Sequence, residues 1–270
     1  MSKARPVVLS IAGLDPSGGA GIVADIRTIA AFGCFPAAAL TSLTFQNTTG
    51  VFGADHQTAA TLRAQVEPIV EDLQVSGAKT GMLPTAEIVA EVARLFQVGN
   101  LPAPVVDPVI VATSGDVLIV DEALQILQEK LIPLACLVTP NIPEAERLAG
   151  FSIQNEADMR RAAEAIRSSG ARAVLVKGGH RFRQQEQVAG PGEALDLLLT
   201  EGGAFKEFRS EYIEVGEVHG SGCTLSAAIA SCLGKGMSLE EAVGAAKEYV
   251  TEAIRALLTT PHIGRGAAPL

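Results

Sequence analysis

Short apolar runs alternate with amphipathic stretches along almost the whole chain, and this alternation limits the possible folds more than any other feature. Residues 7–12 (Val-Val-Leu-Ser-Ile-Ala) have the length and composition of a buried strand. Residues 20–32 then place apolar side chains at helical spacing and end at Gly33. A strand that is repeatedly followed by a helix favours right-handed βαβ units, and therefore a mostly parallel sheet with helices on both faces.

The same pattern recurs as far as residue 177. Further strands are predicted over residues 37–44, 78–80, 104–107, 136–139 and 173–177. Further helices are predicted over residues 59–73, with Pro68 as a kink, 85–96, 122–131, 143–148 and 156–168. A turn at 190–192, an antiparallel hairpin over 194–200 and 204–209, and helices over 223–233 and 239–258 follow. No linker, charge block or repeat divides the chain, so we predict one domain over residues 1–270.

Composition excludes several classes of protein. The 270 residues are 48% apolar and have a mean hydropathy of +0.29, which rules out intrinsic disorder. Thirty acidic and 21 basic residues give a net charge of −9, so nucleic acid and anionic membrane surfaces are poor partners. No apolar run approaches the ~20 residues that span a bilayer. We therefore expect a protein that acts on small molecules.

The cysteines and the N-terminal residues predict a location in a reducing cytoplasm. Cys34, Cys136, Cys223 and Cys232 form no C-x-x-C pair, and their spacing fits neither a zinc ribbon nor a redox motif. The first residues lack the long apolar core and the cleavage site of a signal peptide.

The segment His219-Gly220-Ser221-Gly222-Cys223 opens the first of the two C-terminal helices. Its glycines leave consecutive backbone N–H groups at the positive end of a helix dipole, which is the chemistry of an anion site. Cys223 lies at this N-terminus, where we expect a lowered thiol pKa and an available thiolate. The alternative is a buried cysteine on a tightly packed helix. We favour the functional interpretation for Cys223 and the structural one for Cys232.

Polar side chains follow three of the predicted strands. Asp107, Asn141 and Lys177 lie at or just past strand ends, which parallel strands bring to one edge of a sheet. Lys177, at the end of an apolar strand, suits a polyphosphate. Asn141 and Glu144, one helical turn apart, offer with Asp107 the hard oxygen ligands that Mg²⁺ prefers. The alternatives are a helix cap for Asn141 and Glu144, and a turn residue before Pro108 for Asp107.

A glycine-rich loop over residues 13–21 joins the first strand to the first helix. Alone it predicts an ordinary strand-to-helix turn, but four glycines in nine residues indicate close approach to a ligand. It is no Walker A loop, and its loose dinucleotide match lacks the acidic residue that binds ribose. Asp25, one turn into the helix, is either a solvated acid or a residue that reaches the crevice. Gln46, after the second strand, is either a loop residue or a substrate-facing amide.

Together these segments resemble the bacterial hydroxymethylpyrimidine/phosphomethylpyrimidine kinases of thiamine biosynthesis. The resemblance runs from about residue 7 to about residue 256, through eight blocks in the family's order. The blocks are 12–21, Gln46-Asn47-Thr48, Lys79-Thr80-Gly81-Met82-Leu83, Val106-Asp107-Pro108-Val109, Ser114-Gly115-Asp116, Thr139-Pro140-Asn141-Ile142-Pro143-Glu144, Val176-Lys177-Gly178-Gly179-His180 and 219–227.

The resemblance implies a ribokinase-like fold, with three α/β/α layers and a mostly parallel central sheet. It also implies a homodimer, and ATP- and Mg²⁺-dependent phosphorylation of 4-amino-5-hydroxymethyl-2-methylpyrimidine and then of its monophosphate. By position, the residues that would line the pyrimidine pocket are Gly13, Asp25, Gln46, Met82 and Val109. Those that would bind ATP phosphates and Mg²⁺ are Asn141, Lys177, Glu144 and Asp107. The implied anion hole and catalytic base are Gly220, Ser221, Gly222 and Cys223.

Three positions depart from the family's pattern. Thr113 stands where lysine is common, Phe45 replaces a small residue, and residues 262–266 keep only a trace of a Gly/His-rich ending. Pyridoxal kinase is the alternative function, but Gln46-Asn47-Thr48 favours the aminopyrimidine. A third hypothesis, a non-catalytic pyrimidine-binding module, predicts loss of phosphate-binding residues that this chain retains.

Overall fold

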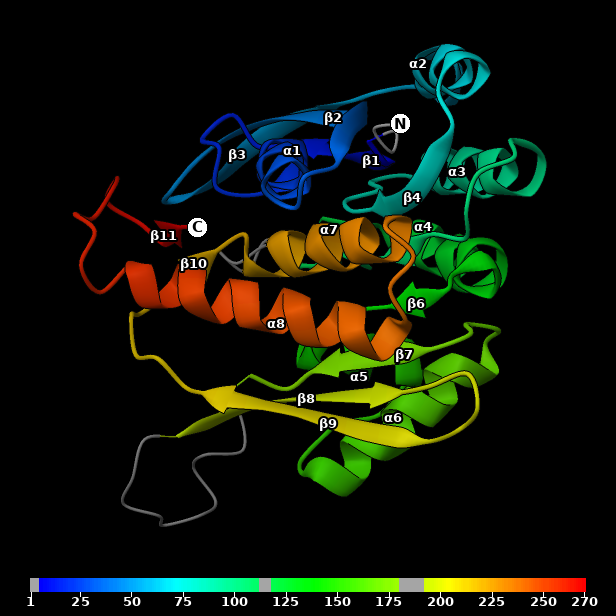
Figure 1. The fold of residues 1–270 in the computed structure, drawn as a ribbon. Coiled ribbons are helices and arrows are strands. Elements are labelled where there is room, and N and C mark those ends of the chain that lie inside the picture. Colours follow the sequence, from blue (N-terminus) through cyan, green and yellow to red (C-terminus); the bar gives the residue numbers. More distant parts are fainter. Residues whose placement is uncertain (1–4, 112–117, 180–191) are drawn as a thin grey trace.

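The computed structural model describes residues 5–111, 118–179 and 192–270. Their main sheet has nine strands in the order β3-β2-β1-β4-β5-β6-β7-β8-β9 (Figure 1). The strands are β1 (Val7–Leu14), β2 (Phe35–Asn47), β3 (Gly50–His56), β4 (Val75–Thr80), β5 (Val105–Val106), β6 (Leu137–Val138), β7 (Val174–Lys177), β8 (Glu193–Leu199) and β9 (Phe205–Glu211). The six central strands, in the spatial order β2, β1, β4, β5, β6 and β7, pair in parallel. Strand β3 at one edge, and β8 and β9 at the other, extend the sheet in antiparallel fashion.

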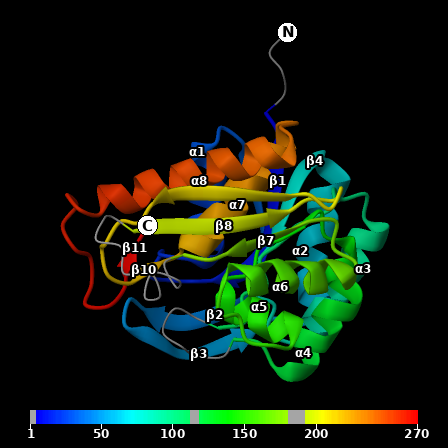
Figure 2. The same cartoon turned by 90° about the horizontal axis from the view of Figure 1, so that it is seen from below.

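Helices cover both faces of this sheet. One face carries α1 (Gly21–Ala31), α7 (Ser221–Gly234) and α8 (Leu239–Ala256). The other carries α2 (Ala59–Asp72), α3 (Ala86–Val98), α4 (Asp121–Ile126), α5 (Ile142–Ala149) and α6 (Glu156–Ser168). Figure 2 shows the two groups on opposite sides of the strands. The predicted three-layer α/β/α fold is confirmed.

Alternate residues of the central strands supply the two hydrophobic cores. Leu9 and Val106 pack with α2 to α6, while their neighbours Val8 and Val105 pack with α1, α7 and α8. Because successive side chains point to opposite faces, a strand between two helical layers must be apolar at consecutive positions. This requirement explains the continuous apolar runs in the sequence.

Most predicted elements are present, with two differences. The first is β3, which forms an antiparallel hairpin with β2 where the sequence predicted only a polar loop over residues 45–50. This edge strand contains two glycines and is largely exposed, so it lacks the apolar alternation that reveals a strand. The second is the helix predicted over 122–131, in which α4 ends at Ile126 and a wider π-type turn covers Leu127–Leu131.

Some predictions lie outside the described residues. They concern Thr113, the block Ser114-Gly115-Asp116, His180 and most of the turn at 190–192. Within the part of the chain that the structure describes, no helix combines the length and apolarity needed to cross a bilayer.

Helix α7 lies almost directly on β4. A Cβ atom added at Gly77 would lie 2.5 Å from the carbonyl oxygen of Ala230, a backbone atom that cannot rotate away. Gly234 of the same helix lies against the backbone of Gly77 in turn. Small residues therefore set the depth at which α7 packs.

We predict that Gly77→Ala lowers the free energy of unfolding by about 1–3 kcal/mol, because the added methyl group must push α7 off the sheet. The matched control is Gly202→Ala, since, apart from its chain neighbours, the only heavy atom of the described residues within 4 Å of a Cβ there is the Thr200 hydroxyl oxygen, at 4.0 Å. Urea unfolding of both variants measures the difference. Equal midpoints for Gly77→Ala and Gly202→Ala would contradict the packing argument.

Candidate active site

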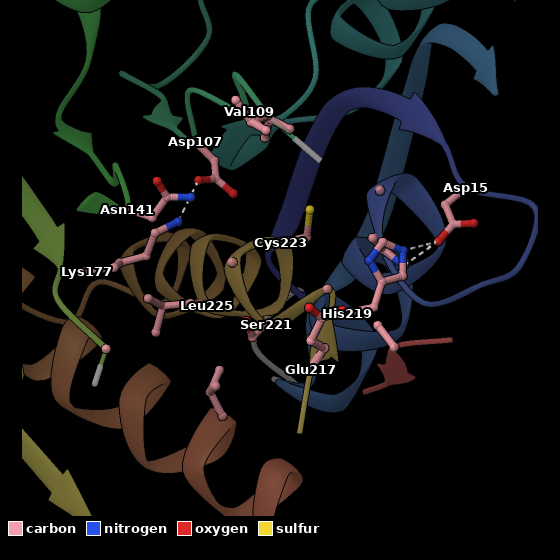
Figure 3. Close-up of a pocket in the computed structure, with 18 of the residues that line it drawn as sticks. Asp15, Asp107, Val109, Asn141, Lys177, Glu217, His219, Ser221, Cys223 and Leu225 are labelled. Atoms are coloured by element: carbon pink, nitrogen blue, oxygen red, sulfur yellow. Dashed lines mark hydrogen bonds and ion pairs between the residues drawn. The ribbon is translucent and has the colours of Figure 1, made fainter. Parts of the chain in front are cut away.

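A cavity of about 1170 Å³ follows the edge of the sheet where the parallel strands end. Of the residues predicted to form the site, all except Asp25 line it: Gly13, Gln46, Met82, Asp107, Val109, Asn141, Glu144, Lys177, Gly220, Ser221, Gly222 and Cys223. Figure 3 shows Asp107, Asn141 and Lys177 on one side of the N-terminus of α7, and Asp15 with His219 on the other. Segments distant in sequence thus converge on one cavity.

The N-terminus of α7 is built as an anion site. Its N-cap residue, Gly220, has φ +87°, and among the described residues no side chain caps the helix. Ser221, Gly222 and Cys223, which form the first turn of α7, line the cavity. A side chain at Gly220 would collide with the carbonyl of Gly19, so glycine is required both for conformation and for contact. The free N–H groups and the helix dipole favour a bound phosphate.

Cys223 is half-buried in the wall of the cavity, and its environment differs from the expectation. Burial raises the pKa of the Cys223 thiol to about 11, although the positive charge of Lys79 opposes the shift. The expected fall in pKa is therefore wrong, because the loss of hydration outweighs the favourable charge. The thiol is the main species at neutral pH, and its thiolate becomes more populated as pH rises.

Asp107 and Lys177 form a buried ion pair, with 3.0 Å between Oδ1 and Nζ. The Asp107 carboxylate also accepts hydrogen bonds from Thr139 (3.1 Å) and Ser226 (3.2 Å). Burial alone would raise the pKa of Asp107, but Lys177 holds it below its usual value. A Cβ atom at Gly222 would lie 3.1 Å from Nζ of Lys177, so this glycine leaves room for the ammonium group beside the anion site.

Asn141 and Glu144 form a complete capping box on α5. The Asn141 side chain accepts from the Glu144 backbone N–H (2.9 Å), and Oε2 of Glu144 accepts from the Asn141 backbone N–H (2.8 Å). Oε1 of Glu144 accepts from the N–H of Ile110 (3.3 Å). Burial raises the pKa of Glu144, with Lys177 lowering it and Asp107 raising it further. The helix-cap interpretation is confirmed, and the metal-binding role remains a prediction.

Asp25 lies in the interior rather than on the cavity wall. Its carboxylate accepts both from Nζ of Lys79, at 2.8 and 2.9 Å, and from the Ser10 hydroxyl at 2.6 Å. Both charged side chains are fully buried. Burial raises the pKa of Asp25, whereas Asp25 raises the pKa of Lys79 against the opposing effect of burial, and the two side chains form a hydrogen-bonded pair in the interior. Both interpretations of Asp25 are therefore wrong, because its carboxylate is neither solvated nor among the residues that line the cavity.

Three residues expected to line a pyrimidine pocket, Gly13, Met82 and Gln46, lie together in the wall of the cavity. A Cβ atom at Gly13 would lie 2.6 Å from Cε of Met82, so the glycine makes room for the methionine. Gln46 is half-buried near the end of β2, and its Oε1 lies 2.9 Å from the Thr44 hydroxyl. That hydroxyl has one proton and also lies 2.6 Å from the carbonyl of Leu14, so it satisfies one acceptor at a time.

Two residues of this site, Asp15 and His219, had no assigned role in the sequence analysis. Nε2 of His219 lies 2.9 Å from Oδ2 of Asp15 and 3.5 Å from Nε2 of Gln46. Asp15 also accepts from Ser17 and from the Ala20 backbone. The sequence Asp15-Pro16-Ser17 is a turn signature that could have identified this loop-organising carboxylate.

Comparison with known proteins shows the family of this chain. The phosphomethylpyrimidine kinase family matches residues 15–270. A hydroxymethylpyrimidine/phosphomethylpyrimidine kinase of Rhizobium meliloti is 45% identical over 98% of this chain and 96% of the relative. A thiamine biosynthesis bifunctional protein of Geobacter sulfurreducens is 44% identical over 98% of this chain, which spans 52% of that longer protein.

Solved structures of two kinds of kinase share this fold. A phosphomethylpyrimidine kinase from Clostridium difficile is 40% identical, with a TM-score of 0.79, over 93% of this chain and 100% of that one. A pyridoxal kinase from Staphylococcus aureus in complex with AMP-PCP is 30% identical, with a TM-score of 0.86, over 99% of this chain and 93% of that one. The chain belongs to the phosphomethylpyrimidine kinase family.

Proposed function

We propose that this chain is an ATP-dependent kinase that phosphorylates 4-amino-5-hydroxymethyl-2-methylpyrimidine and then its monophosphate. The observation that carries the proposal is the pairing, in one cavity, of an uncapped α7 N-terminus beside Lys177 with the amide of Gln46. The first binds phosphate groups, and the second suits an aminopyrimidine. Family membership supports the same activity.

The phosphate side of the cavity stabilises charge. In phosphoryl transfer the protein mainly positions the reactants and neutralises charge on the transferred group. The N–H groups of residues 221–223 and the ammonium group of Lys177 supply that neutralisation without reorganising, because packing and the Asp107 ion pair already hold them in place. The thiolate form of Cys223, the minor form at neutral pH, accepts the proton of the substrate hydroxyl as that oxygen bonds to the γ-phosphorus of ATP, and the bond from the γ-phosphorus to the β–γ bridging oxygen breaks, so that ADP leaves.

Asp107 and Glu144 suit a hydrated Mg²⁺ ion. Two buried carboxylates share one ammonium group, Lys177, which lowers the pKa of both, while Asp107 raises the pKa of Glu144. A bound cation would therefore relieve the repulsion between the two carboxylates. Their oxygens already accept hydrogen bonds, which favours contact through water. Among the described residues no three potential ligand side chains form a cluster, as expected where substrate phosphates complete the coordination. When bound, the ion would neutralise the ATP phosphates.

Gln46 supplies recognition of the acceptor. A primary amide offers an acceptor beside a donor, and an aminopyrimidine offers an exocyclic N–H beside a ring nitrogen, so two parallel hydrogen bonds form. Because the Thr44 hydroxyl can donate its proton to the Leu14 carbonyl instead of to Gln46, the Gln46 oxygen can accept a hydrogen bond from a bound substrate.

Pyridoxal phosphorylation is a second candidate, because the structural neighbour with a TM-score of 0.86 is a pyridoxal kinase. Pyridoxal lacks an amine beside its ring nitrogen and would leave the Gln46 amide partly unsatisfied. We therefore propose the aminopyrimidine as the preferred acceptor. We also propose that the protein is located in the cytoplasm and that it forms a homodimer. Analytical sedimentation of the purified protein tests the homodimer.

We predict that Cys223→Ser lowers kcat by about 10²–10⁴ at neutral pH, the usual contribution of a general base. With a pKa of about 11, the Cys223 thiolate is the minor form at neutral pH, and its fraction rises about tenfold per pH unit towards that value. Wild-type kcat should therefore increase with pH between 7 and 9, and the variant should lose that increase. Full activity of Cys223→Ser would exclude the proton-acceptor role.

Glu144→Gln tests the metal hypothesis, since it removes charge but keeps an oxygen that can accept from the Asn141 backbone. The expected result is a higher Mg²⁺ concentration for half-maximal rate, at least about threefold, with an unfolding midpoint close to that of the wild type. The matched control is Glu146→Gln on the same helix, which does not line the cavity. Identical Mg²⁺ titrations for all three proteins would leave Glu144 as a helix cap only.

Gln46→Met tests substrate identity. An unpaired buried polar group costs about 1–3 kcal/mol, so kcat/KM for hydroxymethylpyrimidine should fall by about one to two orders of magnitude. The kcat/KM for pyridoxal should change much less, because pyridoxal does not form both hydrogen bonds with the Gln46 amide in the wild type. Steady-state kinetics with both acceptors decide the matter. A wild-type protein that prefers pyridoxal, or equal pyrimidine turnover after substitution, would overturn the assignment.

A further inference from the structure

Asp15 organises the glycine-rich loop from within. Its Oδ1 accepts from the backbone N–H and the hydroxyl of Ser17, at 2.8 and 2.6 Å, and its Oδ2 accepts from the N–H of Ala20 at 2.8 Å. Burial would raise the pKa of Asp15, but the hydrogen bonds from His219, Ser17 and Ala20 hold it at about 2. The carboxylate is therefore ionised, and His219 is the one partner among these that comes from a distant segment.

The His219 ring fills the space between the two glycine loops. It is 16% exposed, and a Cβ atom at Gly19 would lie 2.5 Å from its Cδ2 atom. One residue later, Gly220 contacts the carbonyl of Gly19 so closely that no side chain fits. The loop of residues 13–21 and the anion loop of residues 220–222 therefore meet backbone to backbone, with His219 bonded to Asp15 beside the junction.

The C-terminal segment fixes the backbone of His219 and the hairpin of Gln46 together. Strand β10 (Val218–His219) pairs in parallel with β11 (Ala268–Pro269), and the carbonyl of His219 accepts from the N–H of Leu270 at 3.2 Å. The N–H of Ala267 donates to the carbonyl of Thr48 at 3.0 Å, in the turn between β2 and β3. One strap of chain thus connects His219 to the turn that follows Gln46 (Figure 1).

From these contacts we propose that His219 is a positioning residue for the acceptor half of the site. Its Nε2 donates to the carboxylate of Asp15, and the same edge of the ring lies against the amide nitrogen of Gln46 at 3.5 Å, so that the substrate-binding amide and the anion loop keep a fixed separation. The alignment of the acceptor hydroxyl with the transferred phosphate depends on that separation, and a displacement of ~1 Å can cost ~10²-fold in rate. The proposal rests on the proposed kinase function.

The test compares His219→Leu with His219→Gln, whose amide N–H can replace the donor to Asp15. His56→Leu is the matched control, because His56 is exposed on β3 and contacts Ser42 outside the cavity. For each protein we would measure KM and kcat for hydroxymethylpyrimidine, KM for ATP, and the thermal midpoint. A double-mutant cycle with Asp15→Asn then tests whether the two residues act together.

For His219→Leu we expect KM for the pyrimidine to rise about tenfold or more and kcat to fall, with KM for ATP changed by less than about threefold. His219→Gln should recover most of the loss, and adding Asp15→Asn to His219→Leu should cost less than Asp15→Asn costs in the wild type, because only the bonds of Asp15 to Ser17 and Ala20 then remain to be affected. Unchanged pyrimidine kinetics would overturn the proposal. So would losses in His219→Leu and Asp15→Asn that multiply in the double variant, or a loss that follows the thermal midpoint and that glutamine does not restore.

Failure of the proposed function gives a different result. The wild type alone decides whether hydroxymethylpyrimidine is phosphorylated, whereas only the comparison among variants decides the role of His219. If the wild type instead phosphorylates pyridoxal, the same variants measured with pyridoxal test the positioning role.

Discussion

The placement of helix α7 is the constraint on which the site depends. Its glycine and alanine residues let it rest on β4 at backbone distance, and its N-terminus then lies at the edge where the parallel strands end. A larger residue at position 77 or 220 would displace that N-terminus from Lys177 and from the glycine-rich loop. Core packing therefore determines the geometry of the site, because the helix that completes the second hydrophobic core also carries residues 220–222 at its N-terminus.

Charge balance is the second constraint. The cavity wall carries carboxylates at Asp15, Asp107 and Glu144, and each has a donor that the fold supplies: His219, Lys177 or backbone N–H groups. These donors reduce, but do not cancel, the negative charge that a phosphate group would meet in the cavity, since like charges repel. The buried Lys79–Asp25 pair adds a further fixed dipole beneath Cys223. Removing one partner of such a pair leaves the other charge buried without a partner, and this lowers the free energy of unfolding by more than the intact pair contributes.

Much of this arrangement could be predicted from the sequence, and the exceptions have physical causes. Apolar runs and helical periodicity located the central strands and helices, and strand-end polar residues located Asp107, Asn141 and Lys177 on the cavity. The edge strand β3 was missed because an exposed strand needs no apolar face. Burial of Asp25 and the Asp15–His219 contact were missed because they join residues 54 and 204 positions apart in sequence. Local patterns carry no information about such pairs, and only the assembled sheet brings them together.

The environment of Cys223 shows which of two opposing effects prevails for a thiol in the wall of the cavity. A helix N-terminus and the ammonium of Lys79 favour the thiolate, while removal of water favours the thiol, and burial prevails by raising the pKa of the thiol to about 11. In the proposed mechanism, a permanent thiolate beside the N-terminus of α7 would repel the γ-phosphate of ATP, and a neutral thiol avoids that repulsion. The cost is that only the small thiolate fraction can accept a proton at neutral pH. If phosphoryl transfer here passes through a loose transition state, as the proposed mechanism implies, the N–H groups at the start of α7 contribute at every pH, and the Cys223 thiolate adds to them as the pH rises.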